Sequence, residues 1–176
     1  YSDEQIRPYT FNMAPFLADK RVAQQGYLTS EPYTIEKEAG IKPKVFLLAD
    51  EGFPGYATMV LVSDSLIAKN PTAVRAFVEA TAKGWNDYLN GDPSAADALI
   101  KKDNPEMTQD LLDQARAKLK SYQIVEGGDA KTLGVGAMTD ARWAEFFKVA
   151  SDQGVYPKDM DIKQAYTLEF VGKAAN

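Results

Sequence analysis

The chain has 176 residues, of which 45% are hydrophobic, and its 25 acidic and 20 basic residues give a formal net charge of −5. The charges are mixed along the sequence, without the clusters of lysine and arginine that phosphate backbones select, which argues against a nucleic-acid partner. Cysteine and histidine are both absent, which excludes disulfides, thiolate nucleophiles and the commonest general base and metal ligand, and so favours a binding protein over an enzyme.

Short extended and helical patterns alternate in the first third of the chain, as they do in a layered α/β arrangement. The patterns predict two strands, at Tyr9–Met13 and Tyr27–Thr29. A predicted helix follows each of them, at Ala14–Gln24 and Pro32–Glu38. Gly26 is expected to end the first helix, because glycine often follows a helix C-terminus. We therefore expect an α/β fold.

Two apolar runs come next, Lys44–Leu48 and Ala57–Val62, and both are expected to be strands. Between them, Asp50–Tyr56 contains two glycines, a proline and two aromatic residues, which predicts an ordered turn or a crossing between domains. We accordingly divide the chain into residues 1–54 and 55–176. Neither apolar run approaches the about 20 residues of a membrane-spanning helix, so no membrane insertion is expected.

Long amphipathic helices are predicted after this boundary. Asn70-Pro71, Asp92-Pro93 and Asn104-Pro105 each combine an N-cap residue with a proline suited to the first helical position. Further helices are predicted at Thr108–Ser121 and Thr139–Gln153. Apolar residues recur in them at three- and four-residue spacing, which is typical of a face packed in the core. In the first helix these residues are Val74, Phe77, Val78, Thr81, Trp85 and Tyr88.

The strongest functional signal is the segment Gly26–Tyr33, in which a predicted strand leads through hydroxyl and carboxylate side chains into a helix that starts with proline. In open α/β sheets such strand ends face the ligand crevice, and free N–H groups at a helix start bind polar ligand atoms. An alternative stays open at this point. Ser30 or Glu31 could simply cap the helix, and a cap does not exclude a ligand contact.

Glycines between Gly127 and Met138 do not follow the order of a phosphate-binding loop or of a dinucleotide turn, so they predict turn geometry before the next helix. The carboxylate pairs Asp110 with Asp113 and Asp159 with Asp161 lie among polar residues and indicate solvated surface. No cofactor, metal or catalytic residue is therefore predicted.

Several segments together resemble the NMT1/THI5-like group of ABC solute-binding proteins, and the resemblance covers most of the chain. The motif around the Ser-Glu-Pro sequence is moderately specific to this group. The segments are Gln24–Tyr33, Pro43–Leu48, Gly84-Trp85, Tyr88–Asp92, Asn104–Met107 and Gly136–Trp143.

The resemblance implies a type II periplasmic binding protein-like fold, in which two α/β lobes joined by crossing strands bind a solute between them. Family chains are usually near twice this length, so the chain is expected to be the C-terminal part of such a protein. Residues 1–54 would be the second half of the inserted ligand-binding lobe. Residues 55–176 would hold the crossing strand and the helix-rich C-terminal part of the other lobe. The expected partners are a small-molecule solute and the permease subunits of an ABC importer, at a periplasmic or lipid-anchored location.

Within this frame, a few polar groups and aromatic walls would bury the solute as the lobes close. A buried carboxylate needs a donor or a cation, so Glu31 facing the cleft favours a nitrogen-containing solute, similar to a thiamin pyrimidine precursor or riboflavin. The predicted ligand-binding residues are Tyr27, Thr29, Ser30, Glu31, Tyr33 and Tyr56.

Three alternatives stay open at this stage. The same fold binds nitrate, sulfonates or taurine in similar proteins. A pyrimidine-precursor synthase-like enzyme shares the fold, although such enzymes use histidine and a cysteine-rich motif that this sequence lacks. A structural or sensory domain could also reuse the fold without a closing cleft.

Overall fold

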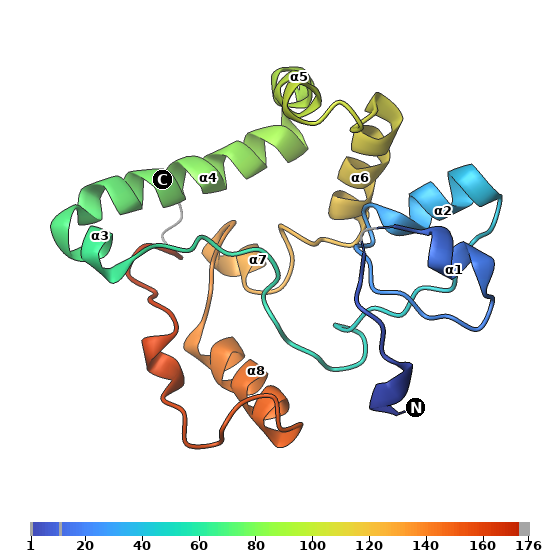
Figure 1. Cartoon of the computed structure of the whole chain (residues 1–176). Helices are drawn as coiled ribbons and strands as arrows, with labels where there is room; N and C mark the ends of the chain where they lie inside the picture. The colour runs from blue at the N-terminus through green and yellow to red at the C-terminus, as the bar shows by residue number, and fades with distance from the viewer. Residues whose placement is uncertain (1, 11, 173–176) are drawn as a thin grey trace.

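The computed structural model describes residues 2–10 and 12–172, and throughout this part of the chain the regular structure is helical, with no β-strand (Figure 1). The helices are η1 (Asp3–Gln5), α1 (Ala14–Ala18), α2 (Glu31–Ala39), α3 (Asp64–Lys69), α4 (Pro71–Asn90), α5 (Ser94–Asp103), α6 (Gln109–Ser121), α7 (Ala130–Leu133), α8 (Asp140–Asp152) and η2 (Ile162–Gln164). None of the helices described has the length and apolar character that crossing a membrane requires.

The arrangement of the helices is open rather than layered. In Figure 1, α4 runs along one side of the molecule, α1, α2 and α6 lie toward one end, α8 lies on the side opposite α4, and α7 is drawn between α4 and α8. The chain from residue 41 to 63 passes between these groups without regular structure. The C-terminal segment returns to α4, where Arg75 donates a hydrogen bond of 3.2 Å to the Glu169 carbonyl and lies over the ring of Phe170.

The strands predicted from sequence are wrong for the described residues. Lys44–Leu48, Ala57–Val62 and Tyr27–Thr29 have irregular or turn backbone, as do the described residues of Tyr9–Met13, whose Phe11 lies outside the described part. A strand needs ladder hydrogen bonds to a neighbour, and the sequence pattern reports only the local preference. No such neighbour is present within residues 2–10 and 12–172. The α/β class therefore stays a prediction.

Consequently, the apolar runs are largely in solvent, with Phe46 67%, Leu48 69% and Leu61 97% exposed. The turn predicted at Asp50–Tyr56 forms only in part and begins earlier, within the predicted strand Lys44–Leu48. It spans residues 48–52, where the Phe53 N–H donates to the Leu48 carbonyl at 2.9 Å. Gly52 supplies the positive φ of 84° that this turn uses, a conformation that side chains disfavour.

Two other predicted boundaries are corrected by local hydrogen bonds. The helix predicted over Ala14–Gln24 ends at Ala18, because the Asp19 carboxylate instead accepts from the Arg21 N–H at 3.0 Å and Gly26 is not reached. Asn104-Pro105 does not start a helix either. The Asn104 side chain accepts from the Glu106 N–H at 3.1 Å, which forms a turn and leaves Thr108 as the N-cap of α6.

The start of α4 is confirmed. Asn70 caps the helix through its side-chain oxygen, which accepts from the Ala73 N–H at 3.1 Å, and Pro71 occupies the first helical position. The apolar face of α4 is only partly buried, however. Val74 is 5% exposed, but Phe77 is 62% and Trp85 39% exposed.

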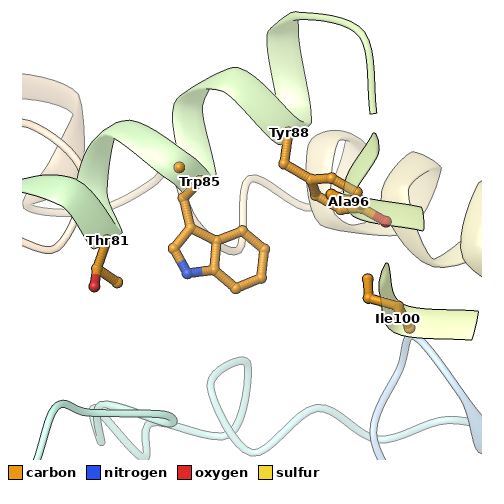
Figure 2. Close-up of a pocket in the computed structure, with 6 residues that line it drawn as sticks. Thr81, Trp85, Tyr88, Ala96 and Ile100 are labelled. Atoms are coloured by element: carbon orange, nitrogen blue, oxygen red, sulfur yellow. The ribbon is translucent and has the colours of Figure 1, made fainter. Parts of the chain in front are cut away.

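The middle of α4 therefore faces an open hollow instead of the expected core. Figure 2 shows Thr81, Trp85 and Tyr88 projecting from α4 toward this hollow, with Ala96 and Ile100 contributed by α5. Its volume is about 260 Å³. The helical period was read correctly, but period alone does not show whether another element covers the face.

A buried carboxylate joins α4, α5 and α6. Asp97 is 2% exposed, and its oxygens accept hydrogen bonds from the Tyr88 hydroxyl at 2.9 Å and from Gln109 Nε2 at 2.8 Å. Arg116 Nη1 lies 3.5 Å away and also pairs with the exposed Asp113. The charge is thus compensated from three directions, as a buried carboxylate requires.

The same partners determine the ionisation of Asp97. Burial acts to raise its pKa, but the hydrogen bonds from Gln109 and Tyr88 and the charge of Arg116 outweigh burial and lower it. A lowered folded-state pKa contributes stability above the unfolded carboxyl pKa of about 3.9, and this contribution is lost as the pH falls through the folded value.

We expect Asp97→Ala to reduce the free energy of unfolding by about 3 kcal/mol, because Arg116, Tyr88 and Gln109 lose a shared buried partner. Asp113→Ala is the matched control, since it removes the exposed partner of the same arginine and is expected to cost less than about 1 kcal/mol. Urea unfolding at neutral pH measures both variants. Equal losses would show that burial of Asp97 does not matter to the packing of the three helices.

Candidate ligand-binding site

Glu31 is held by groups that precede its own helix. It is the first residue of α2, and its two carboxylate oxygens accept hydrogen bonds from the Tyr9 hydroxyl at 2.9 Å and from the Tyr27 N–H at 2.6 Å. Gly26 makes this close approach possible, because a Cβ at that position would lie 3.0 Å from Glu31 Cβ and 3.1 Å from Oε2. The carboxylate therefore closes the loop that leads into α2.

The Tyr9 hydroxyl acts as a hydrogen-bond donor in this arrangement. Burial, together with the hydrogen bond to Glu31 and its charge, raises the pKa of Tyr9, so the hydroxyl keeps its proton at neutral pH. Ser30 occupies the N-cap position of α2, but its side chain makes no capping hydrogen bond. The Tyr27 ring is 66% exposed. Of the two roles considered for Glu31, the structure favours that of a local scaffold residue.

Tyr33 in α2 and Thr29 in the loop before α2 both contact α6. The Tyr33 hydroxyl donates to Asp110 Oδ2 at 2.6 Å, and Lys37 Nζ lies 2.6 Å from the same oxygen. Gln114 donates its side-chain N–H to the Thr29 carbonyl. Hydrogen bonds from Lys37, from Thr108 at the start of α6 and from Tyr33 hold the pKa of Asp110 well below its usual range. Tyr33 thus joins α2 to α6, and the Thr29 carbonyl joins the loop before α2 to α6.

Tyr56 lies in a different group of contacts. Its hydroxyl donates to Asp129 Oδ2 at 2.7 Å and accepts from the Thr139 N–H at 2.9 Å, at the N-terminus of α8. The Arg142 guanidinium stacks 4.3 Å from the Tyr56 ring centre, and its Nε donates to the Pro54 carbonyl at 2.7 Å. The hydrogen bonds therefore divide the predicted residues into two groups, with Tyr56 separate from the others.

The Tyr56 group borders an aromatic pocket with a cavity volume of about 290 Å³. Trp143 forms its best-buried wall at 8% exposure, and its indole stacks on the Tyr166 ring at 4.7 Å with an angle of 4° between the planes. The Phe146 ring meets the indole edge to face at 6.0 Å. The pocket is lined by Tyr56, Met59, Trp143, Phe146, Tyr156, Met160, Ile162 and Ala165.

This wall is the part of the site that sequence analysis missed. The spacing of Trp143 and Phe146 in α8 indicated a core-packing face, and Trp143 does pack in that way. The same two rings also border the cavity. The available signal was the density of aromatic residues from 143 to 166, where Tyr156 and Tyr166 follow the helix outside any periodic pattern.

Chemically, the pocket suits a flat, mostly apolar ring. Aromatic pairs prefer stacked or edge-to-face contacts at centroid distances of about 4.5–7 Å, which the existing rings already adopt. Burial and the hydrogen bond to Asp129 raise the pKa of Tyr56, so its hydroxyl stays neutral at the pocket edge. Within residues 2–10 and 12–172, no group of three or more carboxylates could hold a metal ion.

Comparison with known proteins identifies the family. The family model described as NMT1/THI5 like matches residues 2–96, more than half of the chain. The chain is also 29% identical over 158 residues to the riboflavin-binding protein RibY of Chloroflexus aurantiacus, covering 90% of this chain but 44% of that protein. The chain thus spans less than half the length of this relative. No solved structure matches significantly. The chain belongs to the NMT1/THI5-like family.

Proposed function

We propose that the chain is part of the solute-binding component of a bacterial ABC importer, which captures a small nitrogen-containing ring compound and delivers it to the permease. The observation that carries the proposal is the aromatic pocket beside Tyr56, with Trp143 and Phe146 as walls. Family membership and the name of the riboflavin-binding relative support a binding role without catalysis.

The size and walls of the pocket favour a planar ring system. Ligand pockets usually measure about 300–1,000 Å³, so a cavity of about 290 Å³ accommodates a ring but not a long substituent as well. Stacking on aromatic side chains stabilises a flat heterocycle by about 1–3 kcal/mol per ring. A riboflavin-like ring or a thiamin-type pyrimidine fits this description, and its substituent would extend toward the solvent.

Small anions fit the pocket less well. Nitrate, sulfonates and taurine need cationic or multiple N–H partners to replace their hydration. The residues that line the cavity include no lysine or arginine. The neighbouring Arg142 donates to the carbonyls of Pro54 and Gly55. The proposal therefore places a ring compound ahead of the anionic solutes.

The whole protein is proposed to bind its solute between two lobes in the periplasm or at the outer face of the cytoplasmic membrane. Residues 1–54 are assigned to one lobe and residues 55–176 to the other. All residues that line the aromatic pocket belong to the second range, so the pocket would be the wall that this lobe contributes to the cleft. On this assignment, the hydrogen bond from Tyr33 to Asp110 and that from Gln114 to the Thr29 carbonyl pass between the lobes. They would act as contacts of the closed state.

The full-length protein should bind riboflavin with quenching of flavin fluorescence, because the ring stacks against aromatic side chains. We expect Tyr156→Ala to raise the Kd about ten-fold, since Tyr156 lines the pocket and is 39% exposed. Tyr122→Ala is the control, because Tyr122 is similarly exposed at 50% and packs instead near Lys118.

Three further ligands are tested by isothermal titration: taurine, nitrate and the aminopyrimidine part of thiamin. Binding of taurine or nitrate in place of both ring compounds would refute the proposed ligand class. Equal Kd values for the two tyrosine variants would show that the solute does not bind in the aromatic pocket.

Glu31→Gln separates the two roles considered for this residue. The observed hydrogen bonds predict a loss of stability of about 1 kcal/mol, because the Tyr9 hydroxyl and the Tyr27 N–H lose a charged acceptor. Glu36→Gln, on the exposed side of α2, should leave the Tm unchanged. Thermal melts and riboflavin titrations are run on both. A Kd raised ten-fold or more at an unchanged Tm would instead place Glu31 in the ligand site.

A further inference from the structure

One wall of the aromatic pocket comes from the chain that follows α8. We call residues 156–166 the return segment, because the chain turns after α8 and runs back beside this helix toward its first turn (Figure 1). The segment lines the pocket with Tyr156, Met160, Ile162 and Ala165. Its backbone hydrogen bonds are local, such as that from the Ala165 N–H to the Ile162 carbonyl at 3.0 Å. Among the described residues, no backbone hydrogen bond joins the segment to another element.

The end of the return segment is held by one carboxylate of α8. Asp140 Oδ1 accepts a hydrogen bond from the Tyr166 hydroxyl at 2.5 Å, and Lys163 Nζ lies 2.5 Å from the same oxygen. Tyr166 also stacks on Trp143, which follows Asp140 by one turn of the helix. Lys163, and after it Tyr166, lowers the pKa of Asp140, so the carboxylate is charged at neutral pH.

These attachments are weaker than those of the other walls. The side chains of Asp140 and Lys163 are each 59% exposed, and exposed ion pairs contribute little stability and are screened by salt. The pair of Lys158 with Asp152, at the start of the segment, is exposed as well. The Tyr56 hydroxyl, in contrast, has two hydrogen bonds in a part-buried setting. The return segment is therefore the wall that moves most easily.

We propose that the return segment is a movable wall, which opens to admit the solute and closes over it, and that Asp140 is the positioning residue that holds it closed. This inference rests on the proposed function and adds the route by which the ring enters. A cavity of about 290 Å³ is at the lower end of the usual range for ligand pockets, so a ring with a substituent needs a wall that yields. Asp140 is not among the residues that line the cavity, and it acts through Tyr166 and Lys163.

A movable wall has a specific kinetic consequence. The contacts of Asp140 form in the empty closed protein and again in the closed complex, and they are broken in the open state through which the solute passes. A contact that stabilises both end states equally leaves the equilibrium between them unchanged. Its loss therefore speeds entry and release together. Damage to a fixed wall would instead weaken the complex alone and speed release without speeding entry.

The test follows riboflavin binding to the full-length protein, and its release, by stopped-flow measurement of flavin fluorescence. We expect Asp140→Ala to raise the association and dissociation rate constants each by about three- to ten-fold, with a Kd that changes by less than about two-fold. Asp87→Ala is the matched control. Asp87 forms a similarly exposed ion pair with Lys83 on α4, outside the pocket, so its loss should change neither rate constant.

Lys163→Met is a second variant, which removes the ion pair but leaves α8 and the hydroxyl contact of Tyr166 in place. Riboflavin is uncharged at neutral pH, so added salt acts on the ion pairs of the protein. Both rate constants of the unmodified protein should rise between about 20 and 300 mM salt, and those of Lys163→Met should respond less. A third readout needs no solute. Trypsin should cleave within the return segment of unliganded Asp140→Ala faster than in the unmodified protein, because opening exposes the backbone.

The readouts separate the possible failures. A rise in the dissociation rate constant alone would show that the wall is fixed, and unchanged rate constants in both variants would show that Asp140 does not hold it. Either result would overturn the inference and leave the proposed function intact. Failure of the unmodified protein to bind riboflavin or the aminopyrimidine of thiamin would overturn the proposed function. Equal trypsin cleavage of the unliganded proteins would overturn the role of Asp140 in that case as well.

Discussion

The buried carboxylate of Asp97 is the interaction on which the arrangement of the helices depends. It receives donors from α4 and from α6 while belonging to α5, so the three helices meet at one charge. A buried charge tolerates little displacement of its partners, because each lost hydrogen bond leaves it less compensated. From this fixed point α6 extends to α2, where Asp110 receives the Tyr33 hydroxyl and the Lys37 ammonium. A series of polar contacts thereby connects segments that share little apolar core.

At α8 the same side chains pack in the core and line the aromatic pocket. Trp143 is among the best-buried apolar residues, yet it borders the cavity and stacks on Tyr166. Tyr56 is held on the opposite side by Asp129 and by the first turn of α8. Rings fixed in this way would lose little side-chain entropy if the proposed flat solute entered, which is the benefit of a preformed site. The Tyr56 hydroxyl already donates to Asp129 and accepts from the Thr139 N–H, so it orients its own ring rather than the solute.

Sequence reasoning succeeded where the signal is local and failed where it depends on distant partners. The bounds of α2, α6 and α8 and the start of α4 follow from caps, prolines and helical period, and agree with the prediction to within about one residue. The strands at Lys44–Leu48 and Ala57–Val62 need a neighbouring strand that their own pattern cannot reveal. For the candidate site, Tyr56 was predicted as a ligand residue and lies at the aromatic pocket, whereas its neighbour Trp143 was assigned to the core. A residue packed in the core and a residue lining a cavity show the same helical spacing in the sequence, and only the folded structure distinguishes the two.

The exposure of the run from Met59 to Val62 has a consequence for handling the protein. Leu61 is 97% exposed in a segment of apolar, β-prone residues whose backbone has no ladder partner in the described structure. Such an unpaired run is a template for strand addition by another molecule. We therefore expect any self-association through this segment to grow with concentration, so dilute samples are the appropriate reference. Light scattering across a dilution series is therefore the control for self-association in every titration of the isolated chain.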